Sequence, residues 1–536
     1  MPRPTIAAGL AVLGGIALVA VPASAQQQGH DHAGAPPAAL GQVHFPVSCT
    51  PEAQAAFDEA MKLQHSFWYQ AADQAHRVVL ERDPNCVMAY WGRALTMLIN
   101  PFTPPVPARL REGRALLEQA QRIGAKTDRE AGLIAALAVL FADDDPAQHR
   151  ARITRYAEAM QQVHSRFPDD SEIGIFTALA LIMAAPPTDK TYANQLRAGE
   201  ILAREFASQP QHPGVAHYLI HTYDTPELAA RGVPAAERYA GIAPDAPHAL
   251  HMPSHIFTRV GRWEDSIATN MRSAEIARAR GETFDEVHAL DYMVYGYLQT
   301  GQIGAAARVV AENARFAGYQ APTPIAYYAL AAMPARYAME RGAWEEAASI
   351  GTRRFDVPFV DAITYFARAM GAARAGRPDA AAADVEALRA AVAALAGRDA
   401  YWQEQVEIQR LAAEGWVAFA RGERDQGAVL LREAAEREGR TDKHPVTPGP
   451  LMPAREQLGE MLMLMDRPAE AQREFEAVQQ TEPRRFRAVY GSARAAEQAG
   501  DRDAARRHYE ILLQIAPQAD AGLPEIVQAR TFLGRG

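Results

Sequence analysis

The chain has 536 residues, of which 48% are hydrophobic, 22% charged and 8% aromatic. This ordinary globular composition excludes a wholly disordered or coiled-coil protein, and the length allows about three or four domains or one repeated unit stacked many times. A formal net charge of −9 argues against nucleic-acid binding, which needs a basic surface. Only four residues are lysines, which argues against Schiff-base chemistry.

Residues 1–25 are typical of a secretory signal peptide. Arg3 supplies a positive charge, residues 6–21 form an apolar run, and a small-x-small cleavage site ends at Ala25. The run is shorter than the roughly 20 residues that a membrane-spanning helix needs. We therefore predict cleavage after Ala25, no transmembrane segment in the mature chain, and a periplasmic or secreted product.

The next segment, residues 26–44, is polar, rich in Gly and Pro, and aperiodic. Such a composition cannot bury enough apolar surface to order itself. We therefore expect a flexible leader here, followed by one folded region over residues 45–536.

Export affects the interpretation of the two cysteines. Cys49 precedes a predicted helix, about 52–65, and Cys86 follows its predicted partner, about 69–83. These two points lie at the same end of an antiparallel hairpin, and an oxidising compartment favours a bridge. We predict a structural disulfide, with two buried free thiols as the alternative.

Histidines are concentrated in one central stretch. Six of the sixteen lie between residues 212 and 255, namely His212, His217, His221, His248, His251 and His255. His217, His221 and Asp224 follow the spacing i, i+4, i+7, which is one face of a helix. His248, His251 and His255 follow i, i+3, i+7, again one face. We expect His212 only to begin a helix, and His65 and His76 to pack locally.

Two further features qualify this pattern. His217 and His251 are 34 residues apart, and so are His221 and His255, so the two pairs occupy equivalent places in successive units. Pro253 leaves two interpretations of the second face. Either proline sits inside one helix, or the helix begins near Pro253 and the shared face of the histidines before it is lost.

A turn motif recurs through the second half of the chain. Its turn positions are Gly261, Gly301, Gly342, Gly376, Gly422, Asp466 and Gly500, at intervals of 40, 41, 34, 46, 44 and 34 residues. In the last two units an alanine, an aromatic residue and a proline follow the turn at offsets of 5, 9 and 17: Ala471, Phe475, Pro483 and Ala505, Tyr509, Pro517. Glycine permits the tight turn, alanine lets two helices approach, and proline ends the second helix.

On these motifs the chain resembles the tetratricopeptide repeat (TPR) family over most of residues 50–520, as an exported bacterial type with a His-rich central segment, 210–300. The resemblance implies an all-α fold, a right-handed α-solenoid of about eight to ten stacked helix-turn-helix units. No segment shows the period-2 alternation of strands. The irregular, proline-rich stretch 441–453 is expected to form a wall of the groove.

The family's register also implies which side chains line the concave groove. It implies that three neighbouring helices each direct three side chains into the groove. These are His217, His221 and Asp224 from the first helix, His248, His251 and His255 from the second, and His288, Asp291 and Tyr295 from the third. A second Met-Pro pair occurs at 333–334, and Arg336 follows it at the position that His255 has after the first pair.

Imidazole with carboxylate suits Zn, Cu, Fe or Ni and leaves open positions for a substrate. Our first hypothesis is an exported solenoid that binds a transition metal, or a metal-dependent small-molecule ligand, through His217, His221, Asp224, His248, His251 and His255, with His288, Asp291, Tyr295 and Arg336 lining the groove. Whether it is an enzyme is left open. The alternative is a non-catalytic periplasmic scaffold that binds a peptide or an envelope protein. Plain structural packing of the histidines is a third interpretation.

Overall fold

A computed structural model describes residues 39–535. The predicted signal peptide and leader residues 26–38 lie outside the described residues. Between residues 39 and 535 the chain forms helices, turns and loops without a β-strand. No helix in this part of the chain combines the length and apolar character needed to cross a membrane. The all-α prediction is therefore confirmed for the described residues.

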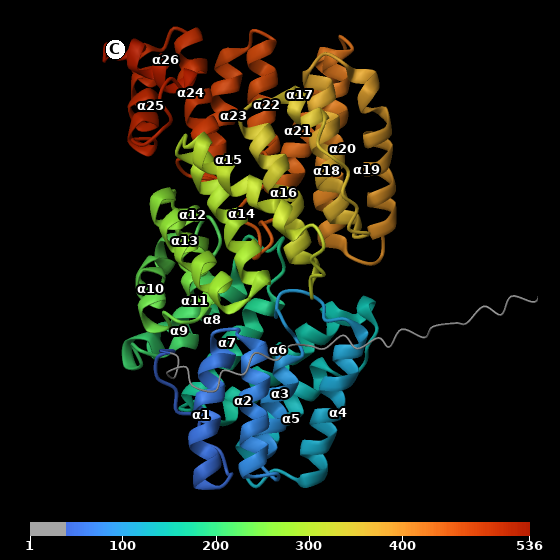
Figure 1. Ribbon diagram of the computed structural model, residues 1–536, viewed down its shortest axis with the longest axis vertical. Helices are drawn as coiled ribbons and strands as arrows, with labels where there is room; N and C mark the ends of the chain where they lie inside the picture. Colours follow the sequence, from blue (N-terminus) through green and yellow to red (C-terminus); the bar gives the residue numbers. More distant parts are fainter. Residues whose placement is uncertain (1–38, 536) are drawn as a thin grey trace, which may run out of the picture. The chain divides into compact units, whose positions relative to one another are not determined.

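Figure 1 shows successive helices lying side by side as antiparallel hairpins, and each helix packs mainly on its neighbours in the chain. In chain order, with η marking short 3-10 helices, they are α1 (Pro51–His65), α2 (Tyr69–Arg82), α3 (Val87–Thr96), α4 (Pro107–Ile123), α5 (Asp128–Leu140), η1 (Pro146–Gln148), α6 (His149–Arg166), α7 (Ser171–Ala184), α8 (Ala193–Ser208), α9 (Pro213–Tyr223), α10 (Ala229–Ile242), α11 (Pro247–His251), α12 (Pro253–Arg259), α13 (Trp263–Arg280), α14 (Thr283–Gln299), α15 (Ile303–Ala311), η2 (Glu312–Phe316), α16 (Pro324–Glu340), α17 (Trp344–Ala348), α18 (Pro358–Arg374), η3 (Pro378–Ala381), α19 (Ala382–Leu395), α20 (Ala400–Ala420), α21 (Arg424–Gly439), α22 (Ala454–Leu464), α23 (Pro468–Thr481), α24 (Phe486–Gln498), α25 (Arg502–Ile515) and α26 (Pro524–Phe532).

The recurring turn motif marks the reversals between paired helices. All seven turn positions have a positive φ: Gly261, Gly301, Gly342, Gly376, Gly422, Asp466 and Gly500. A left-handed residue there ends one helix and lets the next begin within a few residues. Asp466 reaches the same conformation at φ 59°, which aspartate tolerates better than most side chains. The turns predicted from sequence are thus turns in the fold.

The small and aromatic positions of the repeat pack as the spacing predicts. Ala471 is fully buried and Phe475 nearly so, both on α23. A Cβ atom at Gly459 of α22 would lie 2.9 Å from the Phe475 ring, and one at Gly491 of α24 would lie 2.6 Å from it. The phenyl ring therefore fills the space between neighbouring helices where both neighbours lack a side chain.

The first hairpin is joined at its open end by a disulfide between Cys49 and Cys86, whose Cα atoms are 5.0 Å apart. Helices α1 and α2 fall within one residue of the predicted bounds at each end. Because the cysteines flank the hairpin, the bridge ties the start of the folded region to the following helix, α3.

The start of the folded region lies earlier than expected. Residues 39–44, assigned to the flexible leader, pack on the helices instead: Leu40 is 5% exposed and Val43 8%. The Gln42 amide donates to the Gln211 carbonyl at 2.9 Å, and the Ala39 amide donates to the Asp245 carboxylate at 2.7 Å. The polar neighbours of these two apolar side chains hid them in the sequence.

Late segments of the chain return to much earlier ones. The Asp442 amide donates to the Pro187 carbonyl at 3.1 Å, the Trp263 indole to the Arg484 carbonyl at 2.9 Å, and the Asp520 amide to the Gly301 carbonyl at 2.9 Å. These bonds join residues more than 200 positions apart along the chain. The face that the register assigned to an open groove is therefore covered by later residues.

This cover changes the expected groove residues. His288, Asp291, Tyr295 and Arg336 are all buried, at 5% exposure or less. Arg336 donates to the Pro450 carbonyl at 2.7 Å, so the proline-rich stretch lies directly against it. The loop between α21 and α22 packs against Arg336 and Tyr295 and lines a cavity beside them. The assignment of the four side chains to a ligand groove stays a prediction.

Candidate metal centre

Helix α9 positions the first two histidines of the site. Pro213 occupies the first turn of α9, and the His212 side chain caps it by accepting from the Val215 amide at 3.3 Å. Proline suits this position because its missing N–H has no partner there in any case. His217 and His221 follow one turn apart, so their rings project from the same side of α9.

The second group of histidines straddles a break in the helix. Helix α11 ends at His251 and α12 begins at Pro253, while Met252 between them keeps helical angles, φ −53° and ψ −37°. Both interpretations of Pro253 therefore hold in part. A new helix begins at Pro253, but the backbone keeps its helical course through Met252. His251 and His255 keep their shared face as a result.

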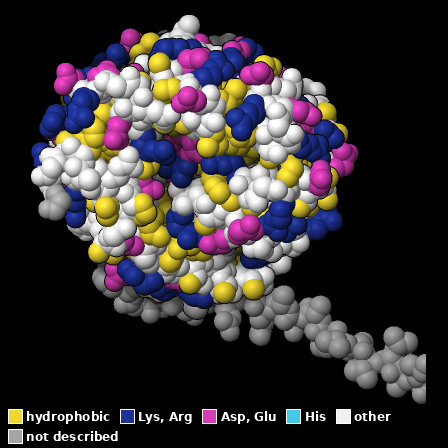
Figure 2. All heavy atoms as spheres, turned by 90° about the horizontal axis from the view of Figure 1, so that it is seen from above, with side chains coloured by type: hydrophobic (Ala, Val, Ile, Leu, Met, Phe, Trp, Pro, Cys, Tyr) yellow, Lys and Arg dark blue, Asp and Glu magenta, His cyan; other side chains and the backbone are white. Residues whose placement is uncertain are grey.

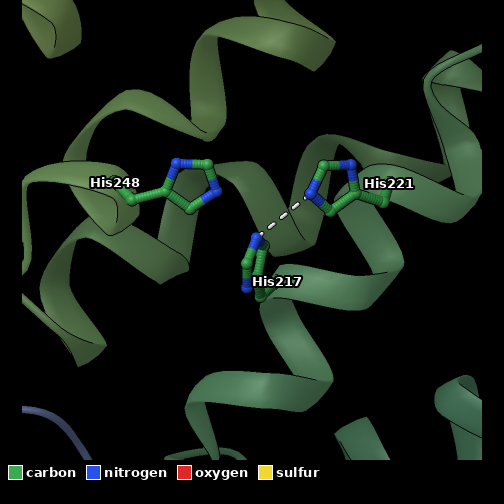
Figure 3. A group of neighbouring side chains, drawn as sticks. All are labelled: His217, His221 and His248. Atoms are coloured by element: carbon green, nitrogen blue, oxygen red, sulfur yellow. Dashed lines mark hydrogen bonds between the residues drawn. The ribbon is translucent and has the colours of Figure 1, made fainter. Parts of the chain in front are cut away.

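The first histidine set consists of His217, His221 and His248. One nitrogen from each lies within 4.8 Å of the others, and Figure 3 shows the three rings directed toward one another from α9 and α11. The Nε2 atoms of His217 and His221 are 3.1 Å apart. His217 is buried, whereas His221 and His248 are partly exposed. The Phe67 ring packs against all three histidines, with ring centres 4.2–5.7 Å apart.

The second histidine set consists of His251, His255 and His288, from α11, α12 and α14. One nitrogen from each again lies within 4.8 Å of the others, and all three residues are buried. The Nε2 atoms of His251 and His255 are 3.0 Å apart. The two sets together bring six imidazoles into one region.

In three of these rings, a hydrogen bond at Nδ1 determines which ring nitrogen carries the proton. The Nδ1 atom of His217 lies 2.7 Å from the His65 carbonyl oxygen, and Nδ1 of His255 lies 3.0 Å from an Asp224 carboxylate oxygen. The Nδ1 atom of His251 lies 2.6 Å from Asn270 Oδ1. The Asn270 amide nitrogen donates to the Ser266 carbonyl, which fixes the orientation of the amide.

Each of these acceptors lacks a proton, so each Nδ1 must donate. The Nε2 atom of a neutral ring then carries a lone pair directed into the site. Histidines that bind metals are held in this way, by a carboxylate or carbonyl that takes the other ring proton.

The histidines of both sets are uncharged near neutral pH. Burial lowers the pKa of His217 and of His288 to about 3. Burial also holds the pKa values of His221, His248 and His251 well below their ordinary range. Metals bind neutral imidazole, so the ligands are already in the required protonation state.

Asp224 does not share the first set, although the sequence grouped it there. Helix α9 ends at Tyr223, and Asp224 turns away at its C-cap. Its carboxylate binds His255, Arg259 at 2.9 Å and Lys443 at 2.8 Å. Burial alone would raise its pKa, but Lys443 and Arg259 hold the pKa of the Asp224 carboxyl well below its usual value. Asp224 therefore supports the second set from behind His255.

The expected groove residues divide into two groups. His288 joins the second set, whereas Asp291 lies 3.6 Å from Arg336 and the Tyr295 hydroxyl donates to Glu482 at 3.2 Å. None of the last three is within either set. Sequence analysis missed Tyr292, whose hydroxyl lies 3.4 Å from His255 Nε2. Its spacing of four residues from His288 on one helix is a signal that could have found it.

A third cluster was not predicted at all. Glu172 on α7 lies 3.1 Å from His65 Nε2 and 2.9 Å from His212 Nε2. Each ring also uses its Nδ1 atom, His65 with the Tyr218 hydroxyl at 3.1 Å and His212 with the Val215 amide. Every nitrogen thus has a hydrogen-bond partner without an ion, which is the pattern of a structural network.

A cavity of about 470 Å³ is lined by two side chains that bind Asp224, and none of the six histidines of the two sets is in its lining. Arg259 and Lys443, both bound to Asp224, contribute to its wall, together with Tyr401 and Trp402. Loop 441–453 forms part of the same wall, as predicted. Figure 2 shows a hollow on one face of the molecule, with Lys and Arg side chains close to Asp and Glu around it and no described histidine visible on that face.

No protein-family model matches this sequence, and no curated protein matches it. Solved structures similar to it include the following three. Yeast Tom70 is 12% identical, with 90% of this chain and 96% of that chain covered and a TM-score of 0.33. The human IFIT1 dimer with m7Gppp-AAAA is 11% identical, with 80% and 90% covered and a TM-score of 0.38. The APC/C hetero-tetramer Cut9-Hcn1 is 12% identical, with 90% and 96% covered and a TM-score of 0.29.

Proposed function

We propose that this helical-repeat protein is exported and binds transition-metal ions through the two histidine sets. The observation that carries the proposal is the arrangement of His251 and His255. Their Nε2 lone pairs face each other at 3.0 Å, while each Nδ1 proton is committed to an acceptor, Asn270 or Asp224. Two facing lone pairs repel unless a proton or a metal cation lies between them.

The donor atoms indicate the kind of ion. Both sets consist of imidazole nitrogens alone, and the two cysteines of the chain are joined in a disulfide far from them in sequence. Imidazole favours zinc, copper or iron, whereas magnesium and calcium prefer oxygen ligands. Three protein ligands per ion leave at least one coordination position free. The partly exposed first set therefore supports access for a small ligand, and catalysis at that position is open to test.

Metal analysis tests the proposal directly. The chain is secreted to the periplasm of a bacterial host, purified, incubated separately with zinc, copper and iron, and dialysed before its metal content is measured. We expect stoichiometric metal in the parent and loss of at least half of it in the double variant His221→Ala/His255→Ala. The control variant His44→Ala/His508→Ala removes two histidines outside both sets and should keep the parent's metal content. Absence of bound metal in the parent would contradict the proposal.

The peptide-binding scaffold has less support. Its groove would occupy the face where Arg336 and Tyr295 lie buried beneath loop 441–453. The scaffold would be favoured over the metal site by a protein partner that remains bound after chelation. Such a partner should be lost only when residues on the protein's surface are substituted. A pull-down with and without chelator distinguishes the two.

A further inference from the structure

We infer that the two histidine sets form a single dinuclear centre, which binds two copper ions side by side. This inference rests on the metal binding proposed above and goes beyond it in the number of ions, their proximity and their identity. It depends on the distances between the sets, on the helices that supply them, and on their charge.

The distances between histidine rings of different sets are as short as those within one set. The ring centres of His221 and His255 are 5.7 Å apart, and those of His248 and His251 are 6.0 Å apart. Within the first set, His221 and His248 are separated by 6.5 Å. No layer of other side chains fits between rings at this spacing, so the six imidazoles form one continuous cluster.

Helix α11 contributes a ligand to each set. His248 belongs to the first set and His251 to the second, and both lie on this five-residue helix. Three residues of helix advance by about 4.5 Å along the axis. Two ions bound to these neighbours are therefore held close together, in the manner of two-metal sites whose ions lie about 3.5–4 Å apart.

The two sets are also built alike. The pair His217 and His221 is repeated 34 residues later as His251 and His255. Each pair presents Nε2 atoms about one hydrogen-bond length apart, at 3.1 and 3.0 Å. A third histidine joins each pair from the next part of the array, His248 in one case and His288 in the other. One ion per set follows from this repetition.

The charge of the cluster favours copper. Neither set contains a carboxylate or thiolate ligand, and the carboxylate behind His255, Asp224, is already neutralised by Arg259 and Lys443. Two divalent ions would place four positive charges in this buried region, whereas two Cu(I) ions place only two. Among divalent ions, Cu(II) binds nitrogen sites most tightly. Copper therefore suits the cluster better than the other ions: Cu(I) adds the least charge, and Cu(II) offsets its higher charge by the tightest nitrogen binding among divalent ions.

Copper counting tests the inference. The purified, metal-free chain is loaded with Cu(I) without oxygen, desalted, and its copper measured per chain; a second sample is loaded with Cu(II) and examined by electron paramagnetic resonance. We expect two copper ions per chain in each sample, and a Cu(II) signal that integrates to well under the copper content because neighbouring ions couple.

Variants that each remove one set sharpen the result. His217→Ala/His221→Ala and His255→Ala/His288→Ala should each bind one copper ion, and their Cu(II) signals should integrate to the full copper content. Melting curves of the metal-free variants show whether each is folded, and the parent's own signal is decisive even if one variant is not.

The outcomes separate the two claims. A parent that binds no copper and no other metal contradicts the proposed function as well as this inference. One ion per chain, or two ions with a fully integrating Cu(II) signal, overturns the dinuclear centre and leaves metal binding intact.

Discussion

His251 and His255 face each other through Nε2 atoms 3.0 Å apart, although the Nδ1 proton of each ring is already donated elsewhere. Neither ring can turn to relieve this contact without breaking the bond behind it. A bound cation would replace a repulsive contact with two favourable ones.

Removal of the acceptor behind His251 should weaken metal binding. In Asn270→Ala the Nδ1 proton loses its partner, and the ring can rotate or change tautomer. Loss of such a supporting acceptor lowers metal affinity about 10–100-fold. Competition with a chelator of known affinity measures the change. Asn270→Asp keeps an oxygen acceptor and should bind within a few-fold of the parent; equal affinity in Asn270→Ala would contradict the assigned proton positions.

The metal-free protein should lose stability as the pH falls below 6.5. Burial lowers the pKa of His76 to about 3, from 6.5 in the unfolded chain. Between these two pH values the unfolded chain binds a proton that the folded chain does not. The free energy of unfolding therefore decreases as the pH is lowered. One such histidine costs about 1.4 kcal/mol at pH 5.5.

The variant His76→Phe isolates this effect. Both His76 nitrogens are buried without a hydrogen-bond partner, and the ring lies against Phe57 at 5.4 Å between ring centres. Denaturant unfolding of parent and variant is compared at pH 7.5 and 5.5. The variant should lose about 1.4 kcal/mol less than the parent over this interval. An identical loss in both proteins would show that His76 does not contribute.

Two glycines should respond oppositely to alanine. A Cβ atom at Gly371 of α18 would lie 2.3 Å from the Ala348 amide nitrogen and 2.6 Å from the Trp344 carbonyl oxygen. Backbone atoms cannot move aside cheaply, so Gly371→Ala should destabilise the fold by about 1–3 kcal/mol. A Cβ atom at Gly241 of α10 meets nothing within 4 Å, and Gly241→Ala should stabilise by about 0.5–1 kcal/mol. Thermal unfolding of the two variants decides the comparison.

Reduction of the disulfide should lower the melting temperature. The bridge spans 37 residues, and a loop of that size corresponds to about 4 kcal/mol of chain entropy in the unfolded state. Melting with and without a thiol reductant measures the effect on the parent. The double variant Cys49→Ser/Cys86→Ser should melt like the reduced parent and show no response to reductant. A parent that is equally insensitive would contradict a structural role.

Local patterns in the sequence were sufficient for much of the fold. Glycine at Gly301 and Gly500 marks a turn because few other residues adopt a positive φ at little cost. His217 and His221 could be grouped because a helix brings positions four apart onto one face. Both inferences depend on residues close together in the chain, where backbone geometry alone determines the relation.

Long-range contacts could not be predicted in the same way. Glu172 brings His65 and His212 together across 107 and 40 residues, with no spacing rule that connects them. Lys443 reaches Asp224 over 219 residues. The cover over the expected groove arises from such contacts. Asp224 leaves the first set for two reasons: α9 ends at Tyr223, and Lys443 binds the Asp224 carboxylate from a distant part of the chain.

The bonds that late segments of the chain make to much earlier ones have a consequence for unfolding. In an open array each unit touches only its neighbours, so hairpins can fray one at a time from either end. Here Lys443 is bound to Asp224, Arg484 to Trp263, and Asp520 to Gly301. The C-terminal hairpins cannot detach without breaking these bonds, so fraying from that end is suppressed and the C-terminal part of the array should resist proteases until the bonds open together.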